Sequence, residues 1–250
     1  MKNVVKVATQ LAVLPLVLIS NIALAESCKV EKNNILAHFD TEISFNVKGQ
    51  NKTEQSTFEF IRQSDSTVLY RYPSSNVSQL WHLQSNGFVK NVHYFDEFSR
   101  AIEYDSVDLP KESRNDWSGK DQIISQAFLN SLENKEKINA CETHYHQEKN
   151  GETWNITWSN QYNLPLIMQH TKADKTVQFK LIDIKQNKEK VTEIVNTLNA
   201  YQGTDFADIG DNESDPFIRK MIHLGFIEHG ASGFYDANGN TLEAESKHNH

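Results

Sequence analysis

The amino-acid sequence predicts an α+β fold, mainly β with a few helices, built on a curved antiparallel sheet or incomplete barrel with helices on its concave side. Three features of the 250-residue chain lead to this prediction. Apolar and polar residues alternate over much of residues 43–185, two stretches carry apolar residues at helical spacing, and residues 1–25 have the form of an export signal. A chain of this length with 38% hydrophobic residues suffices for one large domain with an appendage.

The alternating segments are predicted to be short strands in meander order, because turn residues such as Pro73 and Gly87 separate them. A sheet of about ten strands is large for one layer, so we expect it to curl. The predicted strands are residues 43–47, 58–60, 68–72, 77–83, 88–95, 101–104, 138–148, 153–158, 166–171 and 177–184.

Helical spacing of apolar residues predicts two helices, at residues 123–132 and 191–201, each with its apolar stripe on the sheet. Residues 30–39 suggest a third, shorter helix ahead of the first strand, since Ile35, Leu36 and Phe39 lie close together. We expect these elements to form the main domain at residues 26–201.

The chain after residue 201 has a different composition, rich in Asp, Gly and Asn. Asp215 and Pro216 form a typical N-cap and first-turn pair, which predicts a helix there. We therefore expect a C-terminal appendage of loop and helix at residues 202–243, followed by a disordered tail at residues 244–250.

Residues 1–25 have the three parts of a secretory signal peptide. Lys2 and Lys6 precede an apolar run at residues 11–19, and Ala23 and Ala25 form a small-residue cleavage site. We expect cleavage after Ala25 and a mature protein that is periplasmic or secreted; an uncleaved N-terminal anchor is the alternative. No later stretch approaches the roughly twenty apolar residues of a membrane helix.

Export affects the interpretation of Cys28 and Cys141, the two cysteines of the chain. Both survive cleavage and enter an oxidising compartment, so a disulfide between them is expected. In the chain-entropy model, a loop of this length contributes about 4–5 kcal/mol of stability. The alternative, a reactive thiol, requires an environment that lowers its pKa, and no neighbouring motif supplies one.

Cys141, His144 and His146 lie close together in sequence, and these residue types ligate zinc and copper. Strand alternation, however, places the cysteine on one face of its strand and both histidines on the other. Two histidines alone are an incomplete ligand set, so solvated strand residues are the main interpretation and a metal site is the alternative.

The strand register around Cys141 follows from a two-residue type I′ turn predicted at Asn150 and Gly151. The expected cross-strand pairs are Tyr145 with Ile156, Thr143 with Trp158 and Gln147 with Trp154.

The acidic residues of the appendage are a second candidate metal site, here for calcium. Asp205, Asp208, Asp211, Glu213 and Asp215 supply oxygens, but their spacing does not match the EF-hand pattern. Turn formation and helix capping explain most of them without an ion, so we predict no metal and no cofactor.

Sequence motifs of catalysis are missing: the chain has no G-x-S-x-G elbow, no P-loop and no dinucleotide fingerprint. We therefore expect no catalytic residues and no enzyme. The balance of 25 Lys and Arg against 33 Asp and Glu argues against binding of nucleic acid by bulk charge.

The order of elements resembles the periplasmic lipoprotein-carrier superfamily of the LolA and LolB type. The segments that carry the resemblance are residues 58–63, 68–73, 164–168 and 177–184, within roughly residues 30–200. The resemblance implies an incomplete antiparallel barrel covered by helices, with an apolar cavity that shields lipid chains. Related folds serve as sensors of lipoproteins or envelope stress.

The sequence thus predicts an exported binding or carrier protein that shields an apolar ligand, a lipid or an acylated protein from water. A protein-interaction module with a filled core, which binds another envelope protein, is the alternative, and a metal-binding exported protein is the second alternative. The aromatic residues expected to line a cavity are Phe58, Phe60, Tyr70, Tyr72, Trp81, Phe88, Trp154 and Trp158.

Overall fold

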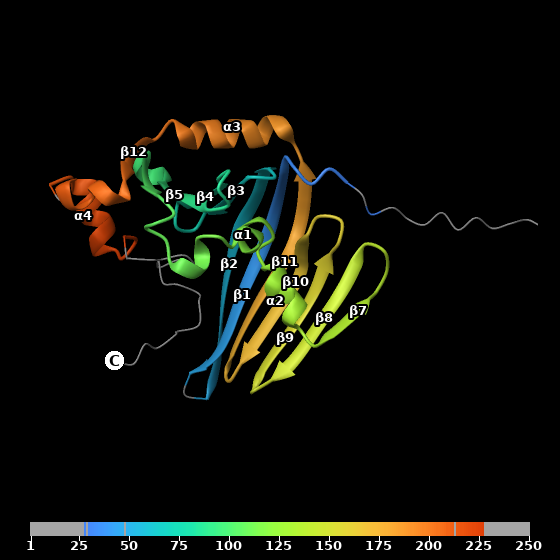
Figure 1. The fold of residues 1–250 in the computed structure, drawn as a ribbon. Coiled ribbons are helices and arrows are strands. Elements are labelled where there is room, and N and C mark those ends of the chain that lie inside the picture. Colours follow the sequence, from blue (N-terminus) through green and yellow to red (C-terminus); the bar gives the residue numbers. More distant parts are fainter. Residues whose placement is uncertain (1–27, 29, 48, 213, 228–250) are drawn as a thin grey trace, which may run out of the picture.

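The computed structural model describes residues 28, 30–47, 49–212 and 214–227. The predicted signal peptide, with its cleavage site after Ala25, and the predicted tail at residues 244–250 lie outside this part of the chain. The described strands form one twelve-stranded sheet, which curves as an open surface between its two edge strands (Figure 1). The prediction of a large, curved and mainly antiparallel sheet is therefore confirmed.

The strand order across the sheet is β12-β6-β5-β4-β3-β2-β1-β11-β10-β9-β8-β7. Neighbouring strands are antiparallel except for β12, which runs parallel to β6. The strands are β1 (Ile35–Val47), β2 (Gln50–Ser64), β3 (Thr67–Tyr72), β4 (Val77–Leu83), β5 (Val89–Phe95), β6 (Arg100–Tyr104), β7 (Asn134–Lys137), β8 (Glu142–Lys149), β9 (Glu152–Ser159), β10 (Leu164–Lys172), β11 (Lys175–Gln186) and β12 (Gln202–Asp205).

The hairpin between β8 and β9 has the predicted register. Asn150 and Gly151 both adopt positive φ, as a type I′ turn requires. The pairs are Tyr145 with Ile156, Thr143 with Trp158 and Gln147 with Trp154. This part of the prediction is confirmed because turn chemistry and alternation both lie within one short segment.

Two strands were not predicted, and both are polar edge strands. β7 has the sequence Asn-Lys-Glu-Lys with every side chain exposed, and β12 has the sequence Gln-Gly-Thr-Asp. An edge strand without a buried face carries no alternation that a sequence can reveal. The predicted strand at residues 138–148 begins later than expected, since β8 starts at Glu142 and residues 138–141 connect it to β7.

Residues 30–39 do not form the predicted short helix, because β1 begins at Ile35. Ile35, Ala37 and Phe39 point to one face of the sheet and are buried, while Leu36 is buried on the other face against the helix α3 (Lys188–Asn199). Burial on both faces removes the alternation of a strand, and the resulting apolar cluster imitates a helix.

The predicted helix at residues 123–132 is replaced by two short helices, α1 (Trp117–Asp121) and α2 (Gln126–Ser131). Ile123 adopts a φ of 68° between them, which is incompatible with a continuous helix. Ser125 then starts α2, because its hydroxyl accepts a hydrogen bond of 3.1 Å from the Phe128 amide.

Helix α3 agrees with the predicted helix at residues 191–201. Asn187 is its N-cap, with the side-chain oxygen accepting from the Lys190 amide at 2.9 Å. Its buried stripe of Val191, Val195 and Leu198 packs on the sheet, as predicted.

The helices cover opposite faces of the sheet, which corrects the prediction that they share the concave side. In Figure 1, α3 lies above strands β3–β5 and α1 lies below them. Helix α3 packs on Leu36, Ile61 and Leu69, whereas α2 belongs to the core around Phe58 and Phe60. Adjacent strand residues point to opposite faces, so these two cores are separated by the sheet.

The C-terminal region, residues 202–227 as described, continues the same fold. Strand β12 extends the sheet, and helix α4 (Pro216–His223) follows Asp215, whose carboxylate accepts a hydrogen bond of 2.8 Å from the Phe217 amide. Four single-turn 3-10 helices complete the described elements: η1 (Asp96–Phe98), η2 (Lys111–Ser113), η3 (Phe206–Asp208) and η4 (Gly210–Asn212).

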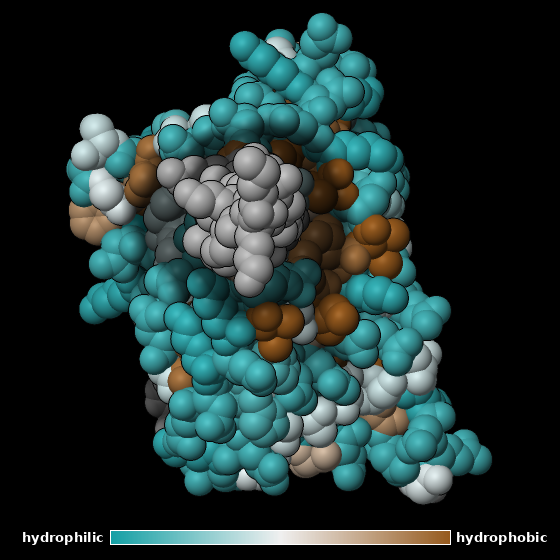
Figure 2. Space-filling model, turned by 90° about the vertical axis from the view of Figure 1, so that its right-hand side faces the viewer, coloured by the Kyte–Doolittle hydropathy of each residue, from teal (hydrophilic) through white to brown (hydrophobic). Residues whose placement is uncertain are grey.

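The predicted disulfide between Cys28 and Cys141 is present, with a Cα–Cα distance of 5.2 Å. It joins residues 113 positions apart and fixes the N-terminal end of the described chain beside the start of β8. The surface on the β7 side of the molecule is mainly hydrophilic, with a few hydrophobic groups around the middle of the view (Figure 2).

Candidate functional site

One face of the sheet, here called the aromatic face, carries most of the aromatic residues that the sequence predicts to line a cavity. The face is defined by the strand positions that alternate with Phe58 and Phe60 on β2 and with Tyr70 on β3. Of the eight predicted residues, Phe58, Phe60, Tyr70, Tyr72, Trp81 and Trp158 are buried in this one core, and Trp154 is half-buried against it.

Phe88 is the exception among the eight, because it lies just before β5 and its exposed fraction is 43%. Phe58 occupies the middle of the aromatic face, where its ring stacks on Phe39 with the centroids 4.8 Å apart. Trp154 lies between Phe128 of α2 and His170 of β10, at centroid distances of 4.7 and 3.8 Å.

Residues 105–133, here called the covering segment, lie over the aromatic face. They contain η2, α1 and α2, and they contribute Leu109, Ile124, Leu129 and Leu132 to the core beneath them. The two α-helices have only 5 and 6 residues. Helices this short are marginal on their own, so the segment depends on its contacts with the sheet.

Arg62 is the main polar link between the sheet and the covering segment. Its side chain is 2% exposed, and its Nε lies 2.6 Å from the Asp121 carboxylate at the end of α1. Its Nη1 donates to the Tyr162 carbonyl at 2.9 Å and to the Lys32 carbonyl at 3.3 Å. One buried guanidinium therefore connects α1, the loop before β10 and the segment that leads into β1.

The carboxyl group of Asp121 responds to this environment. Burial raises its pKa above the ordinary value, and the Arg62 guanidinium opposes that rise. Arg62 was not singled out from the sequence, although the alternation of Phe58 and Phe60 continues to Arg62 and places it on the aromatic face.

Tyr70 and Lys120 form a second link to the covering segment. The Tyr70 hydroxyl donates a hydrogen bond of 2.6 Å to the Lys120 carbonyl, and burial raises the pKa of this tyrosine. The Lys120 ammonium lies 4.2 Å from the centre of the Trp81 ring. Both links attach α1 to the aromatic face through polar groups.

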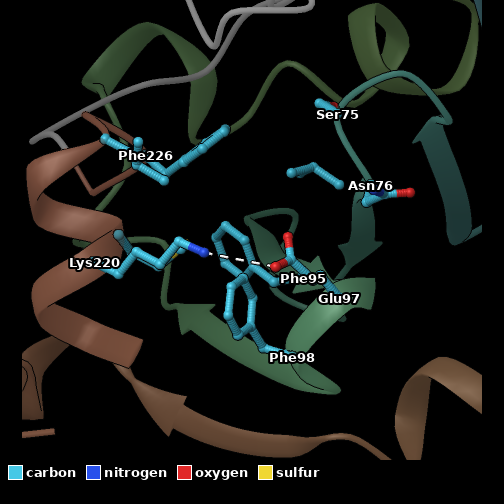
Figure 3. Close-up of a pocket in the computed structure, with 10 residues that line it drawn as sticks. Ser75, Asn76, Phe95, Glu97, Phe98, Lys220 and Phe226 are labelled. Carbon is cyan, nitrogen blue, oxygen red and sulfur yellow. Dashed lines mark ion pairs between the residues drawn. The ribbon is translucent and has the colours of Figure 1, made fainter. Parts of the chain in front are cut away.

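A small pocket lies beside α4 (Figure 3). This end of the molecule lies away from α2 (Figure 1). The pocket encloses about 160 Å³, below the roughly 300–1,000 Å³ of typical ligand sites. Glu97 and Lys220 form an ion pair of 3.6 Å at the pocket. None of the eight predicted aromatic residues lines it; the lining residues are Ser75, Asn76, Val77, Phe95, Glu97, Phe98, Lys220, Met221, Leu224 and Phe226.

Of the candidate metal ligands near β8, Cys141 is bonded to Cys28, which leaves the two histidines. His144 and His146 point to the face of β8 opposite Thr143 and Tyr145, and His146 Nδ1 lies 2.8 Å from the Asn155 side chain. In the part of the chain that the structure describes, no group of three His, Cys, Asp or Glu residues is placed to hold a metal ion.

The acidic residues of the C-terminal region have local roles or are exposed. The Asp205 carboxylate accepts a hydrogen bond of 3.0 Å from the Ala207 amide, and Asp208 and Asp211 are exposed. Glu213 lies outside the described residues. Among those residues, no helix is long and apolar enough to cross a membrane.

Comparisons with known proteins find likeness in structure alone. No family model and no curated protein matches the sequence. A putative outer membrane lipoprotein-sorting protein domain from Vibrio parahaemolyticus matches 68% of this chain and 94% of its own, with 11% identity and a TM-score of 0.33. A LolA superfamily protein from Nitrosomonas europaea matches 65% of this chain and 90% of its own, with 10% identity and a TM-score of 0.27.

A third match is the Pseudomonas aeruginosa MucA/MucB complex, where the similarity covers 62% of this chain and 55% of the other, with 13% identity and a TM-score of 0.26. The matches include proteins of the lipoprotein-carrier type, as the sequence resemblance predicts. These scores and identities describe a likeness in general arrangement, so the proposals below rest on the residues of this chain.

Proposed function

We propose that this chain is an exported, non-catalytic binding protein that holds an apolar ligand, or the acyl group of a modified protein, against the aromatic face. The observation that carries the proposal is the covering segment: an aromatic surface is closed by short helices that polar links attach to the sheet. Burial of an acyl chain on such a surface contributes about 0.8 kcal/mol of binding free energy per methylene group.

Binding at the aromatic face requires the covering segment to move. Leu129 and Ile124 occupy the surface in the closed arrangement, being 1% and 6% exposed. A ligand therefore takes the place of these side chains. Segments that consist of short helices and loops open at a lower free-energy cost than the central strands of a domain.

Export is supported by two features of the chain. The disulfide between Cys28 and Cys141 is typical of proteins in oxidising compartments. Residues 1–25 have the pattern of a signal peptide. An acyl group that moves between the two membranes has to cross the aqueous periplasm, where a binding protein can shield it from water.

A second candidate function is a protein-interaction module, and its supporting observation is the degree to which the aromatic face is already filled. Such a module binds another envelope protein through its surface. The exposed side chains of Ile222 and Leu224 on and after α4, with exposed fractions of 45% and 46%, supply an apolar surface for such a partner.

Native mass spectrometry of the mature protein, exported to a periplasm and purified without detergent or chelator, separates these functions. A bound lipid-sized mass that is lost on denaturation supports the carrier. A bare mass equal to that of the disulfide form contradicts it and favours the interaction module. A metal-sized increment instead supports the metal-binding alternative.

Two matched tyrosine variants test whether the covering segment is the gate. Tyr70→Phe removes the hydrogen bond to the Lys120 carbonyl, whereas Tyr94→Phe removes a hydrogen bond to Asn199 of α3 on the opposite face. We expect Tyr70→Phe to take up an uncharged phenylnaphthylamine dye several-fold faster than the wild type, since one hydrogen bond contributes about 1 kcal/mol. Equal uptake rates in the two variants argue against this gate.

A further inference from the structure

The aromatic face carries three buried polar residues on the adjacent strands β4 and β5. They are Gln79 on β4 and Asn91 and His93 on β5, with exposed fractions of 3%, 1% and 4%. Residues of this kind are rarely so deeply buried unless they have hydrogen-bond partners.

The strand register places Gln79 and His93 side by side. They are direct cross-strand partners, flanked by Tyr70 on β3 and Ile102 on β6. Directly opposite residues of antiparallel strands have their Cβ atoms about 5 Å apart on the same face. The two polar side chains therefore form a pair within an otherwise apolar row.

Gln79 and His93 differ from Asn91 in their hydrogen bonding. The Asn91 amide donates to the Leu80 carbonyl at 3.1 Å. By contrast, Gln79 Nε2 and His93 Nε2 are buried and have no hydrogen-bond partner among the described residues. A buried polar group left in this way costs about 1–3 kcal/mol.

The pair is uncharged near neutral pH. Burial lowers the pKa of His93 to about 4, so the imidazole is neutral, with one nitrogen able to donate. The Tyr104 ring lies 4.8 Å from the His93 ring between centroids and adds apolar surface. A neutral oxygen acceptor matches two uncharged donors better than a charged group does.

The covering segment is attached to the strands that carry the pair, with Lys120 over Trp81 on β4 and Arg114 bonded to the start of β5. Val89, at the start of β5, donates a hydrogen bond of 2.8 Å to the Arg114 carbonyl of that segment. Arg114 in turn holds the segment's own chain, donating from Nε to the Leu109 carbonyl at 2.8 Å. Movement of the segment breaks these contacts at Trp81 and Val89, and we expect a ligand to reach the pair from this side.

We propose that Gln79 and His93 bind the carbonyl oxygen of an ester or amide in the apolar ligand, through hydrogen bonds from Gln79 Nε2 and His93 Nε2. The proposal rests on the proposed function and narrows its ligand class to acyl esters and amides. The carbonyl oxygen has two lone pairs and so satisfies both donors at once.

The test is displacement of the phenylnaphthylamine dye from the full mature protein by methyl laurate and by dodecane. The variants are Gln79→Leu and His93→Leu. The control is Gln169→Leu, the same change on β10 at a position next to Met168 that faces the other side of the sheet. We expect the affinity for methyl laurate relative to dodecane to fall roughly threefold to tenfold in each variant and to stay unchanged in the control.

The possible results are distinguishable. If dodecane and methyl laurate both displace the dye but the ratio is the same in every variant, the polar pair has no role in recognition and only this inference fails. If neither compound displaces the dye from the wild type, the proposed function and the inference fail together.

A second measurement needs no variant and so does not depend on folding of a substituted chain. The infrared carbonyl stretch of isotopically labelled methyl laurate bound to the wild type is expected at lower frequency than the stretch of the same ester in hexane. A stretch at the hexane position contradicts the inference.

Discussion

Strands β3–β6 and strands β7–β9 belong to one sheet but are stabilised in different ways. Helix α3 covers one face of β3–β6, while the covering segment and the C-terminal region cover the other. In β4, the first five residues are all buried, whereas in β8 buried residues alternate with half-buried ones. The aromatic side of β8 and β9 is packed, and their other side carries His144 and His146.

The difference shows where a binding function is compatible with stability. Strands β3–β6, with α3 packed on the face away from the covering segment, form a frame. The covering segment is attached to this frame through the polar links of Arg62 and Tyr70 and through its buried apolar side chains, among them Leu129. Helix α3 and its core lie on the other face of the sheet and include no residue of the covering segment, so we expect them to stay packed when the segment moves.

Among the substitutions that test this difference, Arg62→Met is expected to lower the free energy of unfolding most. The change leaves the Asp121 carboxylate and three carbonyl groups, of Lys32, Asp121 and Tyr162, without their buried partner, so we expect a loss of about 3–5 kcal/mol in the free energy of unfolding. Urea unfolding measures it. The matched control is Arg71→Met on the opposite face, where the ion pair with Glu59 is 31% exposed at the arginine, and a loss of at most about 1 kcal/mol is expected.

Ile218→Ala tests whether the C-terminal region belongs to the frame. Ile218 is 0% exposed in the core of the aromatic face, so its truncation is expected to cost about 3 kcal/mol. The control Ile222→Ala changes an exposed neighbour on α4 and should stay within about 0.5 kcal/mol. A similarly small effect of Ile218→Ala, measured by urea unfolding, would show that α4 is dispensable to the frame.

His93 predicts a dependence of stability on pH. Its pKa in the folded protein is about 4, below the ordinary 6.5, so the unfolded chain binds the proton more readily between these values. Protonation of His93 therefore does not lower the free energy of unfolding above about pH 6.5. As the pH falls below this value, the free energy of unfolding decreases, by about 2 kcal/mol at about pH 5. Urea unfolding of the wild type and of His93→Leu, each at about pH 6.5 and at about pH 5, measures this decrease, since the variant lacks the histidine that causes it.

The smallest expected effects come from the two helix caps. Asn187→Ala at α3 and Ser125→Ala at α2 each remove one capping hydrogen bond, worth about 1 kcal/mol. We expect Asn187→Ala to lower the global stability, and Ser125→Ala mainly to speed amide hydrogen exchange in α2. Equal effects on global stability would mean that the covering segment unfolds together with the frame.

The β8–β9 hairpin could be predicted from the sequence, whereas the start of β1 and the polar edge strands β7 and β12 could not. The β8–β9 hairpin was predicted to the residue, because its turn at Asn150 and its alternation are local. The start of β1 was misread as a helix, because Ile35 and Leu36 are buried on opposite faces by partners far along the chain. Polar strands β7 and β12 carried no pattern at all.

The candidate site shows the same division. The aromatic residues were found from alternation, although their roles in ligand binding stay a prediction. Arg62, Gln79 and His93 were missed, because in a sequence they are ordinary polar residues at strand positions. What marks them is deep burial together with particular partners, or the lack of partners, across strands.

The sequence by itself determined that the two cysteines pair and that alternating residues make a large antiparallel sheet, while the export signal at residues 1–25 stays a prediction. These properties depend on local composition and on period-two patterning, which a linear chain displays directly. Only the tertiary structure decided which face α3 covers, that residues 105–133 lie over the aromatic face, and that Arg62 joins three distant segments. These features depend on contacts between residues far apart in the chain, where burial and hydrogen bonding are set by the packed neighbours and not by the local sequence.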